Sequence, residues 1–307
     1  MKIKITISLS ALCVIMLFSC HNASTTNNKE AIVKLPKPDH VVIVIEENKG
    51  YDQIIGTSQA PYINELAKEG ALFTDSHGVR HPSQPNYLAF FSGSNQGVNG
   101  DECLLDSTPF TTPNLGAALI KAGYTFTGYA QTMPSVGYLP CYYKKSTLTK
   151  AYLYGRKHCP WVNWTGTKEN NFPDSLSQPM TSFPIDFSKL PTVAIVIPDM
   201  DHDMHNNIPH VGSDTTIIKM GDAWLKDNLS RYIDWAKTHN SLFILTFDED
   251  NFTPVNHIPT IFVGPMVKSG QYSDSINHYN VLRTIEAMYH LSPSGTAQAK
   301  PITNVWQ

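Results

Sequence analysis

Ser83 is the first candidate for chemistry in this 307-residue chain, because its neighbours suit a nucleophile. A residue before proline is pushed away from helical angles, so the approach through Pro82 is predicted to be extended. A helix should open at Pro85 and end at Gly93. The hydroxyl would then lie at a helix N-terminus, where free N–H groups and the helix dipole favour anions such as phosphate. A serine that only caps the helix explains this window equally well, so acidic residues elsewhere in the chain must decide between the two interpretations.

Acidic residues follow three separate apolar runs. Residues 41–45, 192–198 and 242–247 have the composition of strands buried on both faces of a parallel sheet. The residues after these runs are Glu46, Glu47 and Asn48; Asp199, Asp201, His202, Asp203 and His205; and Asp248, Glu249 and Asp250. Because ligands gather beyond the carboxyl ends of strands in open α/β sheets, these side chains are expected to meet at one edge.

The donor types indicate a divalent cation beside Ser83. Carboxylates with a few imidazoles suit Mg²⁺, Ca²⁺, Mn²⁺ or Zn²⁺, and do not suit copper(I) or iron–sulfur clusters. Such a cation would lower the pKa of the serine hydroxyl and hold a phosphoryl oxygen, as hydrolysis of a phosphate ester requires. Asn86, one helical turn later, could donate to a phosphoryl oxygen. His158 and His205 could serve the phosphate or the leaving oxygen.

The rest of the chain alternates helices with strands, which predicts an α/β fold. Helices are expected at 61–70, 114–123, 220–239 and 280–290, and further strands at 71–74, 124–129 and 258–264. Residues 131–188 lose this periodicity and are rich in proline, glycine and aromatic residues, which indicates a cap-like insertion over a site. The basic cluster Arg156, Lys157 and His158 in this stretch could meet an anion, or could be a surface patch.

The N-terminus has the pattern of an exported lipoprotein. Two lysines precede an apolar run from Ile5 to Phe18, and Leu17-Phe18-Ser19-Cys20 matches a lipoprotein cleavage site. We expect residues 1–19 to be a signal peptide, Cys20 to be lipidated, residues 20–38 to be a tether and residues 39–307 to be the catalytic domain. An ordinary signal peptide is the alternative. The net charge of −3 would become −5 after loss of the two lysines, so no nucleic-acid surface is expected.

Three cysteines remain after such processing. In an oxidising envelope two of Cys103, Cys141 and Cys159 could pair. We expect Cys141 with Cys159, because they bracket one tyrosine-rich segment. The spacing excludes a CxxC-type zinc site.

Six short motifs resemble those of the bacterial and fungal acid phosphatase and phospholipase C phosphoesterases, in the alkaline phosphatase-like superfamily. They are Val44-Ile45-Glu46-Glu47-Asn48; Pro82-Ser83 with Pro85-Asn86-Tyr87; Lys157-His158 with Pro160-Trp161; Asp203-Met204-His205; Thr246-Phe247-Asp248-Glu249; and His278-Tyr279 with Leu282-Arg283-Thr284. Together they run from about Asp39 to Leu291, in the order of the family.

The resemblance implies a sandwich with a central, mostly parallel sheet and helices on both faces. It also implies Ser83 as the nucleophile of a phosphoserine mechanism, with Asn86, His158 and His205 as contacts of the phosphate or the leaving oxygen. The implied ligands of one divalent ion are Glu47, Asn48, Ser83, Asp248 and Glu249. Some relatives have two aspartates where this chain has Asp248-Glu249.

A second metal ion is the alternative to a single one. Asp201 and His205 have the Asp-x-x-x-His spacing of two-metal relatives, and His278 could be a third ligand. Asp203 could face the site as well, to contact a metal or the phosphate. We favour one ion. His278 could equally anchor the last helix through a backbone carbonyl.

These inferences predict an envelope phosphomonoesterase that acts on phosphate esters of small molecules. Its membrane contact is expected through the lipid anchor only. A phospholipase C-type diesterase is the alternative enzyme, and a catalytically inactive ligand-binding lipoprotein is the alternative outside enzymes. A sulfatase is disfavoured, because Tyr87 stands where the Ser-x-Pro-x-Arg signature requires arginine.

Overall fold

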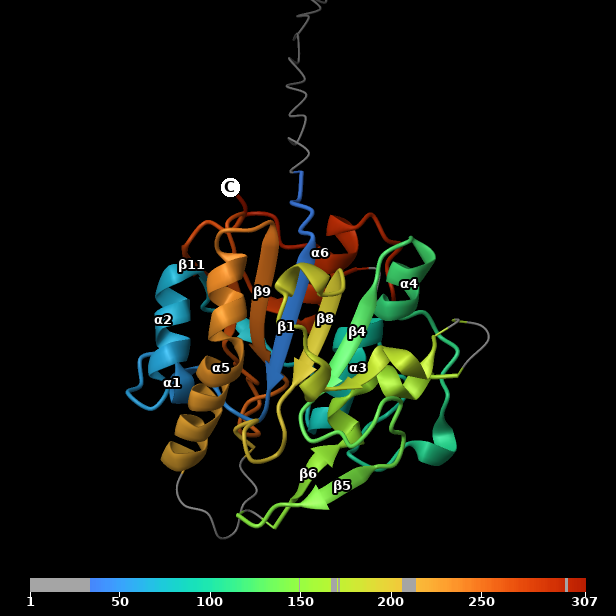
Figure 1. The fold of residues 1–307 in the computed structure, drawn as a ribbon. Helices are drawn as coiled ribbons and strands as arrows, with labels where there is room; N and C mark the ends of the chain where they lie inside the picture. The colour runs from blue at the N-terminus through green and yellow to red at the C-terminus, as the bar shows by residue number, and fades with distance from the viewer. Residues whose placement is uncertain (1–33, 149, 167–169, 171, 206–213, 296–297) are drawn as a thin grey trace, which may run out of the picture. The chain divides into compact units, whose positions relative to one another are not determined.

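A sheet of eight strands lies at the centre of the chain from Leu35 to Gln307 (Figure 1). From one edge to the other the strands are β11 (Gly270–Tyr272), β2 (Ala71–Phe73), β10 (Thr260–Val263), β9 (Ser241–Phe247), β1 (His40–Glu46), β8 (Val193–Ile197), β4 (Phe126–Ala130) and β7 (Ser177–Pro179). Of these, β10 alone runs antiparallel to its neighbours. This computed structural model describes residues 34–148, 150–166, 170, 172–205, 214–295 and 298–307.

The remaining elements flank this sheet. Two small sheets pair β3 (Ser76–His77) with β12 (Ile276–Asn277), and β5 (Tyr142–Lys145) with β6 (Tyr152–Gly155). The α-helices are α1 (Tyr51–Ile54), α2 (Pro61–Glu69), α3 (Ser83–Ser92), α4 (Leu115–Lys121), α5 (Asp214–Ala236) and α6 (His278–Met288). Short 3₁₀ helices are η1 (Leu105–Ser107), η2 (Arg156–His158), η3 (Pro160–Trp164), η4 (Asp174–Leu176), η5 (Met180–Ser182) and η6 (Phe187–Lys189).

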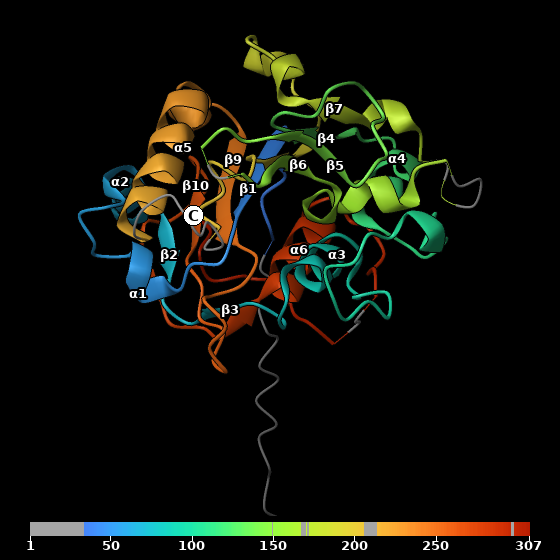
Figure 2. The same ribbon diagram turned by 90° about the horizontal axis from the view of Figure 1, so that it is seen from below.

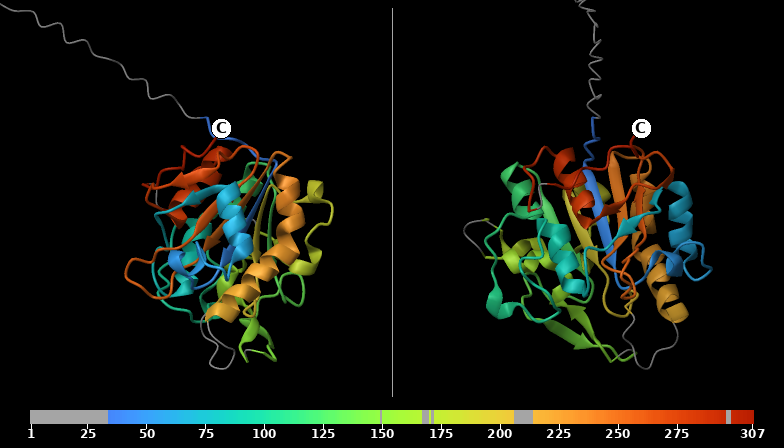
Figure 3. Two further views of the ribbon diagram at one scale, coloured as in Figure 1. Left: turned by 90° about the vertical axis from the view of Figure 1, so that its left-hand side faces the viewer. Right: turned by 180° about the vertical axis from the view of Figure 1, so that it is seen from behind.

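Both faces of the sheet are covered by helices, as expected for a mostly parallel sheet. Alternate residues of β1 point to opposite faces, so Ile43 packs with α3, α4 and α6, whereas Val44 packs with α2 and α5. Figures 2 and 3 show these two groups of helices on opposite sides of the sheet. The predicted α/β fold is confirmed.

The register of the central strands fixes where their carboxyl ends meet. In the parallel pair of β1 and β9, Glu46 lies opposite Phe247. The next residues, Glu47 and Asp248, therefore leave the sheet side by side, and the amide of Asp248 donates to the carbonyl oxygen of Glu46 at 2.9 Å. Strand β1 thus runs from His40, where the chain enters the sheet, to the edge that carries the acids.

Helix α3 begins at Ser83 itself, two residues before the predicted start at Pro85. Proline fits there because the first turn of a helix needs no amide hydrogen bond. Every residue of α3 is buried, since the helix lies against the sheet and packs on α6 and α4. It ends as predicted, with Gly93 in the left-handed region at φ 68°.

Residues 131–188 contribute to the core as well as to the surface. Strand β7 extends the sheet beside β4, and Trp161 and Trp164 are fully buried. The two tryptophans are therefore core residues, whereas Tyr142, Tyr143 and Tyr152 of the β5–β6 hairpin are exposed.

The disulfide joins Cys103 to Cys141, whose Cα atoms are 5.9 Å apart. The predicted pairing of Cys141 with Cys159 is therefore wrong. Cys159 lies between η2 and η3 with a fully buried thiol. Cys141 instead lies just before β5 at the base of the hairpin, where its carbonyl oxygen accepts from the amide of Arg156.

Removing this disulfide should destabilise the protein without abolishing its fold. In Cys103→Ser/Cys141→Ser, the free energy of unfolding is expected to fall by about 2–4 kcal/mol, because the unfolded chain regains the freedom of the closed loop. Denaturant titration of the variant and of oxidised and reduced wild type measures this change. Equal midpoints for oxidised and reduced protein would contradict it.

The predicted signal peptide, tether and lipidated Cys20 fall almost wholly on residues 1–33, which lie outside the described residues. Over the described ranges, no helix combines the length and apolar character needed to cross a membrane.

Candidate active site

Asn48 links the acids at the ends of β1 and β9. Its backbone amide donates to Asp248 Oδ1 at 3.1 Å, and its side-chain Nδ2 donates to Glu249 Oε1 at 2.9 Å. Asn48 has a φ of 35°, in the left-handed region that asparagine adopts more readily than most residues. This turn places Glu47, Asp248 and Glu249 in one group, which we call the carboxylate cluster.

The hydroxyl of Ser83 lies within the carboxylate cluster. Its Oγ is 3.1 Å from Glu47 Oε2 and 3.1 Å from Glu249 Oε1, with hydrogen-bond geometry to both. Ser83 is the first residue of α3 and is 1% exposed. The serine and the acids are far apart in sequence, and the structure brings them together as predicted.

Mutual repulsion and burial raise the pKa values of two acids in the cluster. Burial, with the charges of Glu47 and Glu249, raises the pKa of Asp248 well above its ordinary value. Burial, with the charge of Glu47, raises the pKa of Glu249 to about 7. Two buried oxygens of these residues, Asp248 Oδ2 and Asn48 Oδ1, have no hydrogen-bond partner among the described residues.

These features fit a bound cation. Buried carboxylates that repel one another are stabilised by a positive charge, and oxygen donors suit a hard divalent ion. As they stand in this structure, no three His, Cys, Asp or Glu side chains of the described residues are arranged so that they could hold a metal ion.

Two histidine side chains also lie close to Glu47. His158 Nε2 lies 3.0 Å from Glu47 Oε1, and His205 Nε2 lies 3.6 Å from Glu47 Oε2. Burial alone would raise the pKa of Glu47, but the charge of His158 first, and then those of Lys157 and His205, hold it well below its ordinary value. Burial lowers the pKa of His205 to about 4. Two of the predicted catalytic histidines thus contact the cluster.

The side chain of Asn86 is hydrogen-bonded to the backbone of the loop before Ser83. Its Oδ1 accepts from the amides of Val79 and Arg80 at 2.9 and 3.0 Å, and its Nδ2 donates to the carbonyls of Arg80 and Pro82 at 2.7 and 3.2 Å. Both amide hydrogens are therefore engaged. In this structure Asn86 holds the loop that presents Ser83, and its contact with phosphate stays a prediction.

The residues considered as ligands of a second ion do not all lie close to the carboxylate cluster. His278 Nε2 donates to the carbonyl oxygen of Asp248 at 2.6 Å, which is the anchoring role that the sequence left open. Asp201 Oδ2 accepts from Ser146 at 2.7 Å, outside the cluster. Asp203 lies nearer, with Oδ2 3.8 Å from His158 Nδ1.

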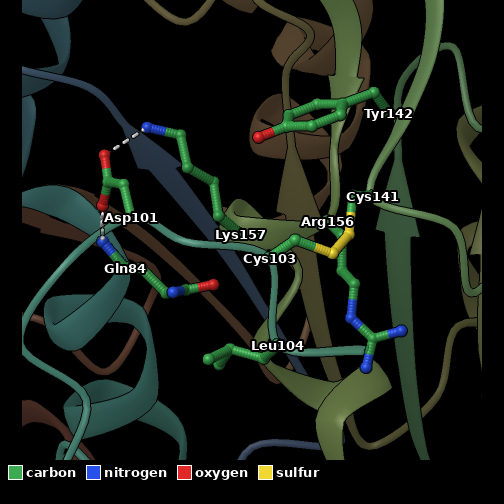
Figure 4. A pocket seen from close by; sticks show the side chains of 8 residues that line it. All are labelled: Gln84, Asp101, Cys103, Leu104, Cys141, Tyr142, Arg156 and Lys157. Atoms are coloured by element: carbon green, nitrogen blue, oxygen red, sulfur yellow. Dashed lines mark hydrogen bonds and ion pairs between the residues drawn. A yellow bond between two sulfur atoms is a disulfide. The ribbon is translucent and has the colours of Figure 1, made fainter. Parts of the chain in front are cut away.

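Three side chains of the site were missed or dismissed at the level of sequence. Tyr87 donates its hydroxyl to Glu47 Oε1 at 2.8 Å. His81 contacts Glu249 Oε2 through Nδ1. Asp101 accepts from the amide of Gln84 at 2.9 Å and from Lys157 Nζ at 2.6 Å (Figure 4). Of these three residues, only Tyr87 could have been identified from sequence, because it lies close to Ser83 in the same motif.

Asp101 connects the first turn of α3 to Lys157. Burial alone would lower the pKa of Lys157, but Glu47 and Asp101 raise it above its ordinary value. The ammonium is thus kept charged close to the carboxylate cluster.

Loss of the Asp101 charge should weaken catalysis by misplacing Lys157. In Asp101→Asn, kcat/KM for a soluble phosphomonoester is expected to fall about 10-fold, the size of one charged hydrogen bond. Asp106→Asn, an exposed residue of the same loop, is the matched control and should retain wild-type kinetics. Equal kinetics for both variants would show that Asp101 does not position Lys157.

Comparison with known proteins shows the family to which this chain belongs. The model of the Phosphoesterase family matches residues 57–292. The phosphatidylinositol-3-phosphatase of Mycobacterium tuberculosis is 46% identical over 275 residues, covering 89% of this chain and 84% of that protein. A probable acid phosphatase of Kluyveromyces lactis is 27% identical, covering 86% of this chain and 63% of that protein. A structure from Vibrio parahaemolyticus in the alkaline phosphatase superfamily has a TM-score of 0.57 at 14% identity, covering 87% of this chain and 71% of that one.

The fold is that of the alkaline phosphatase superfamily, and the protein is a hydrolase that acts on phosphoric esters. Within that class, the chain belongs to the Phosphoesterase family.

Proposed function

We propose that the protein is a metal-dependent phosphomonoesterase that forms a phosphoserine at Ser83. The observation that carries this proposal is the position of Ser83 Oγ, 3.1 Å from the carboxylates of both Glu47 and Glu249 at the N-terminus of α3. Such a hydroxyl is held in place, can pass its proton to a neighbouring oxygen, and faces helix amides that favour an incoming phosphoryl group.

In the first step, Ser83 Oγ forms a bond to phosphorus and the ester oxygen of the leaving alcohol departs. His158 or His205 would contact that oxygen through a ring N–H, and Lys157 would neutralise phosphoryl charge. In the second step, water attacks phosphorus, the bond to Oγ breaks and inorganic phosphate leaves. Asn86 and Asp101 act indirectly, by holding the loop and the lysine.

A single divalent cation, when bound, would neutralise charge and lower the pKa of the serine hydroxyl. Its proposed ligands are Glu47, Asn48, Ser83, Asp248 and Glu249. The unpartnered Asp248 Oδ2 and Asn48 Oδ1 support this set. One ion is favoured over two because Asp201 contacts Ser146 and His278 contacts a backbone carbonyl.

The substrate class follows from similarity. Because this chain is 46% identical to a phosphatidylinositol-3-phosphatase over 89% of its length, we infer that a phosphomonoester on the ring of an inositol lipid is among its substrates.

We also propose the organisation predicted from sequence: a signal peptide at 1–19, lipid on Cys20, a tether at 20–38 and a catalytic domain at 39–307. The exposed part of 131–188 outside the β5–β6 hairpin would be its cap.

Trapping the intermediate tests the mechanism. Wild-type protein incubated with a soluble phosphomonoester and quenched in acid should carry one phosphate on the peptide that contains Ser83, detected by mass spectrometry. Phosphate on another residue, or release of phosphate without labelling, would refute the phosphoserine. Turnover of phosphatidylcholine in preference to the monoester would instead favour a diesterase.

A further inference from the structure

The β5–β6 hairpin exposes an unusual number of large apolar side chains. Five of the ten exposed large hydrophobic residues in the described ranges lie on or beside it: Leu139, Tyr142, Tyr143, Leu148 and Tyr152, each between 38% and 46% exposed. All four residues of β5 are exposed, whereas the central strands β9 and β8 are buried throughout. Together with Lys144, Lys145 and Lys150, these five residues form what we call the hairpin face.

The hairpin face is also cationic. No aspartate or glutamate occurs between Asp106 and Glu169, although the whole chain carries a net charge of −3. The three lysines of the hairpin face, Lys144, Lys145 and Lys150, lie in this stretch and are exposed. Lys145 Nζ lies 5.3 Å from the centre of the Tyr152 ring, and the rings of Tyr142 and Tyr152 stack at 5.0 Å. Aromatic and basic side chains are thus interleaved on one exposed ribbon.

The hairpin is joined directly to the active site. Strand β6 continues without a break into η2, which carries Lys157 and His158. The disulfide from Cys103 to Cys141 fixes the base of the hairpin. Figure 1 shows the hairpin beyond the carboxyl ends of β1 and β8, where the carboxylate cluster lies. A surface that held the hairpin would therefore lie near Ser83.

We propose that the hairpin face docks the enzyme on a bilayer that contains anionic lipids. Tyrosine is enriched at the boundary between water and lipid because its ring is apolar and its hydroxyl is polar, and leucine adds buried apolar area. Lysine binds anionic headgroups and keeps its charge in water. This combination of side chains suits a lipid surface, because the aromatic and apolar groups can enter the boundary of the bilayer and the positive charges complement the negative headgroups.

This inference rests on the proposed phosphatase activity and narrows its substrate to a phosphomonoester carried by a membrane lipid. It adds a second membrane contact to the predicted lipid anchor. The lipid that holds the chain and the lipid that is hydrolysed would then be recognised by different parts of the protein.

Vesicle binding tests the hairpin face. The segment 35–307 contains every described helix and strand and both core clusters, so it can be used without the lipid anchor. It should sediment with vesicles of phosphatidylcholine and phosphatidylserine, and less with phosphatidylcholine alone or at high salt. Lys144→Glu/Lys145→Glu and Tyr143→Ser/Leu148→Ser should each weaken binding about 10-fold or more. Lys268→Glu/Lys300→Glu, an equal charge change at exposed lysines away from the hairpin, should bind like wild type.

Turnover of p-nitrophenyl phosphate separates docking from catalysis. The hairpin variants should hydrolyse this soluble ester at the wild-type rate, yet lose turnover of an inositol phospholipid presented in vesicles. Wild-type binding by the hairpin variants, or equal loss in the control pair, would overturn the docking proposal. Absence of soluble turnover in wild type would overturn the proposed phosphatase activity, while vesicle binding would still decide the docking proposal.

Discussion

Replacing Ser83 with alanine is expected to lower kcat/KM for a soluble phosphomonoester by about 10⁴-fold or more, because no other hydroxyl can take the place of an absent nucleophile. The fold should survive, since alanine fits the first turn of α3 and removes only the hydroxyl between Glu47 and Glu249. Steady-state kinetics measures the loss. Circular dichroism and thermal unfolding show whether the variant is folded.

Ser92→Ala is the matched control for this experiment. Ser92 is also buried, at the other end of α3, where its hydroxyl donates to the carbonyl oxygen of Leu88. The same chemical change there should cost some stability and leave kcat/KM within a few-fold of wild type. If Ser83→Ala keeps more than about a tenth of wild-type activity, Ser83 is not the nucleophile.

Removing divalent cations should have the second largest effect. Treatment with a chelator is expected to lower phosphatase activity about 10²-fold or more, because the buried acids around Ser83 would then repel the phosphoryl group. Activity should return when a divalent salt is added back. Metal analysis of the untreated protein by mass spectrometry identifies the ion and its stoichiometry, which we expect to be one per chain.

Glu47→Gln extends this experiment to a single ligand. The variant keeps the shape of the side chain and loses its charge, so added metal should not restore full activity. Glu46→Gln is the matched control, because Glu46 is the buried neighbour whose carboxylate has no hydrogen-bond partner among the described residues. Full activity of chelated wild type would exclude a cation from the mechanism.

The sequence predicted those parts of the fold and site that depend on local pattern. Runs of β-branched residues identified the central strands, and the acids that follow them were expected to converge because parallel strands share a carboxyl edge. Ser83 could be placed because prolines and a glycine stop define its helix. These signals all lie within a few residues of the side chain they concern.

Pairs of residues that come into contact only through the tertiary fold could not be predicted from local sequence pattern. The contact of His81 with Glu249 spans 168 residues, and the hydrogen bond of Tyr87 to Glu47 spans 40. Nothing in the immediate sequence of either residue names its partner. The cysteine pairing failed for the same reason, since the position of Cys103 beside the hairpin base depends on the packing of a distant loop.

Asn86 shows a related limit. The motif that contains it places the residue one turn from Ser83, and spacing alone cannot say whether its amide faces the ligand or the backbone. The loop before Ser83 has free amides and carbonyls that must be paired when buried, and Asn86 meets that need. A side chain in a catalytic motif can thus be required for a reason that is not chemical.

The direction of β1 separates the point where the chain enters the sheet from the reaction centre. The strand begins at His40 and carries the acids at its far end, seven residues or roughly 20 Å away. Changes to the chain before His40 are therefore expected to leave the geometry around Ser83 unaltered.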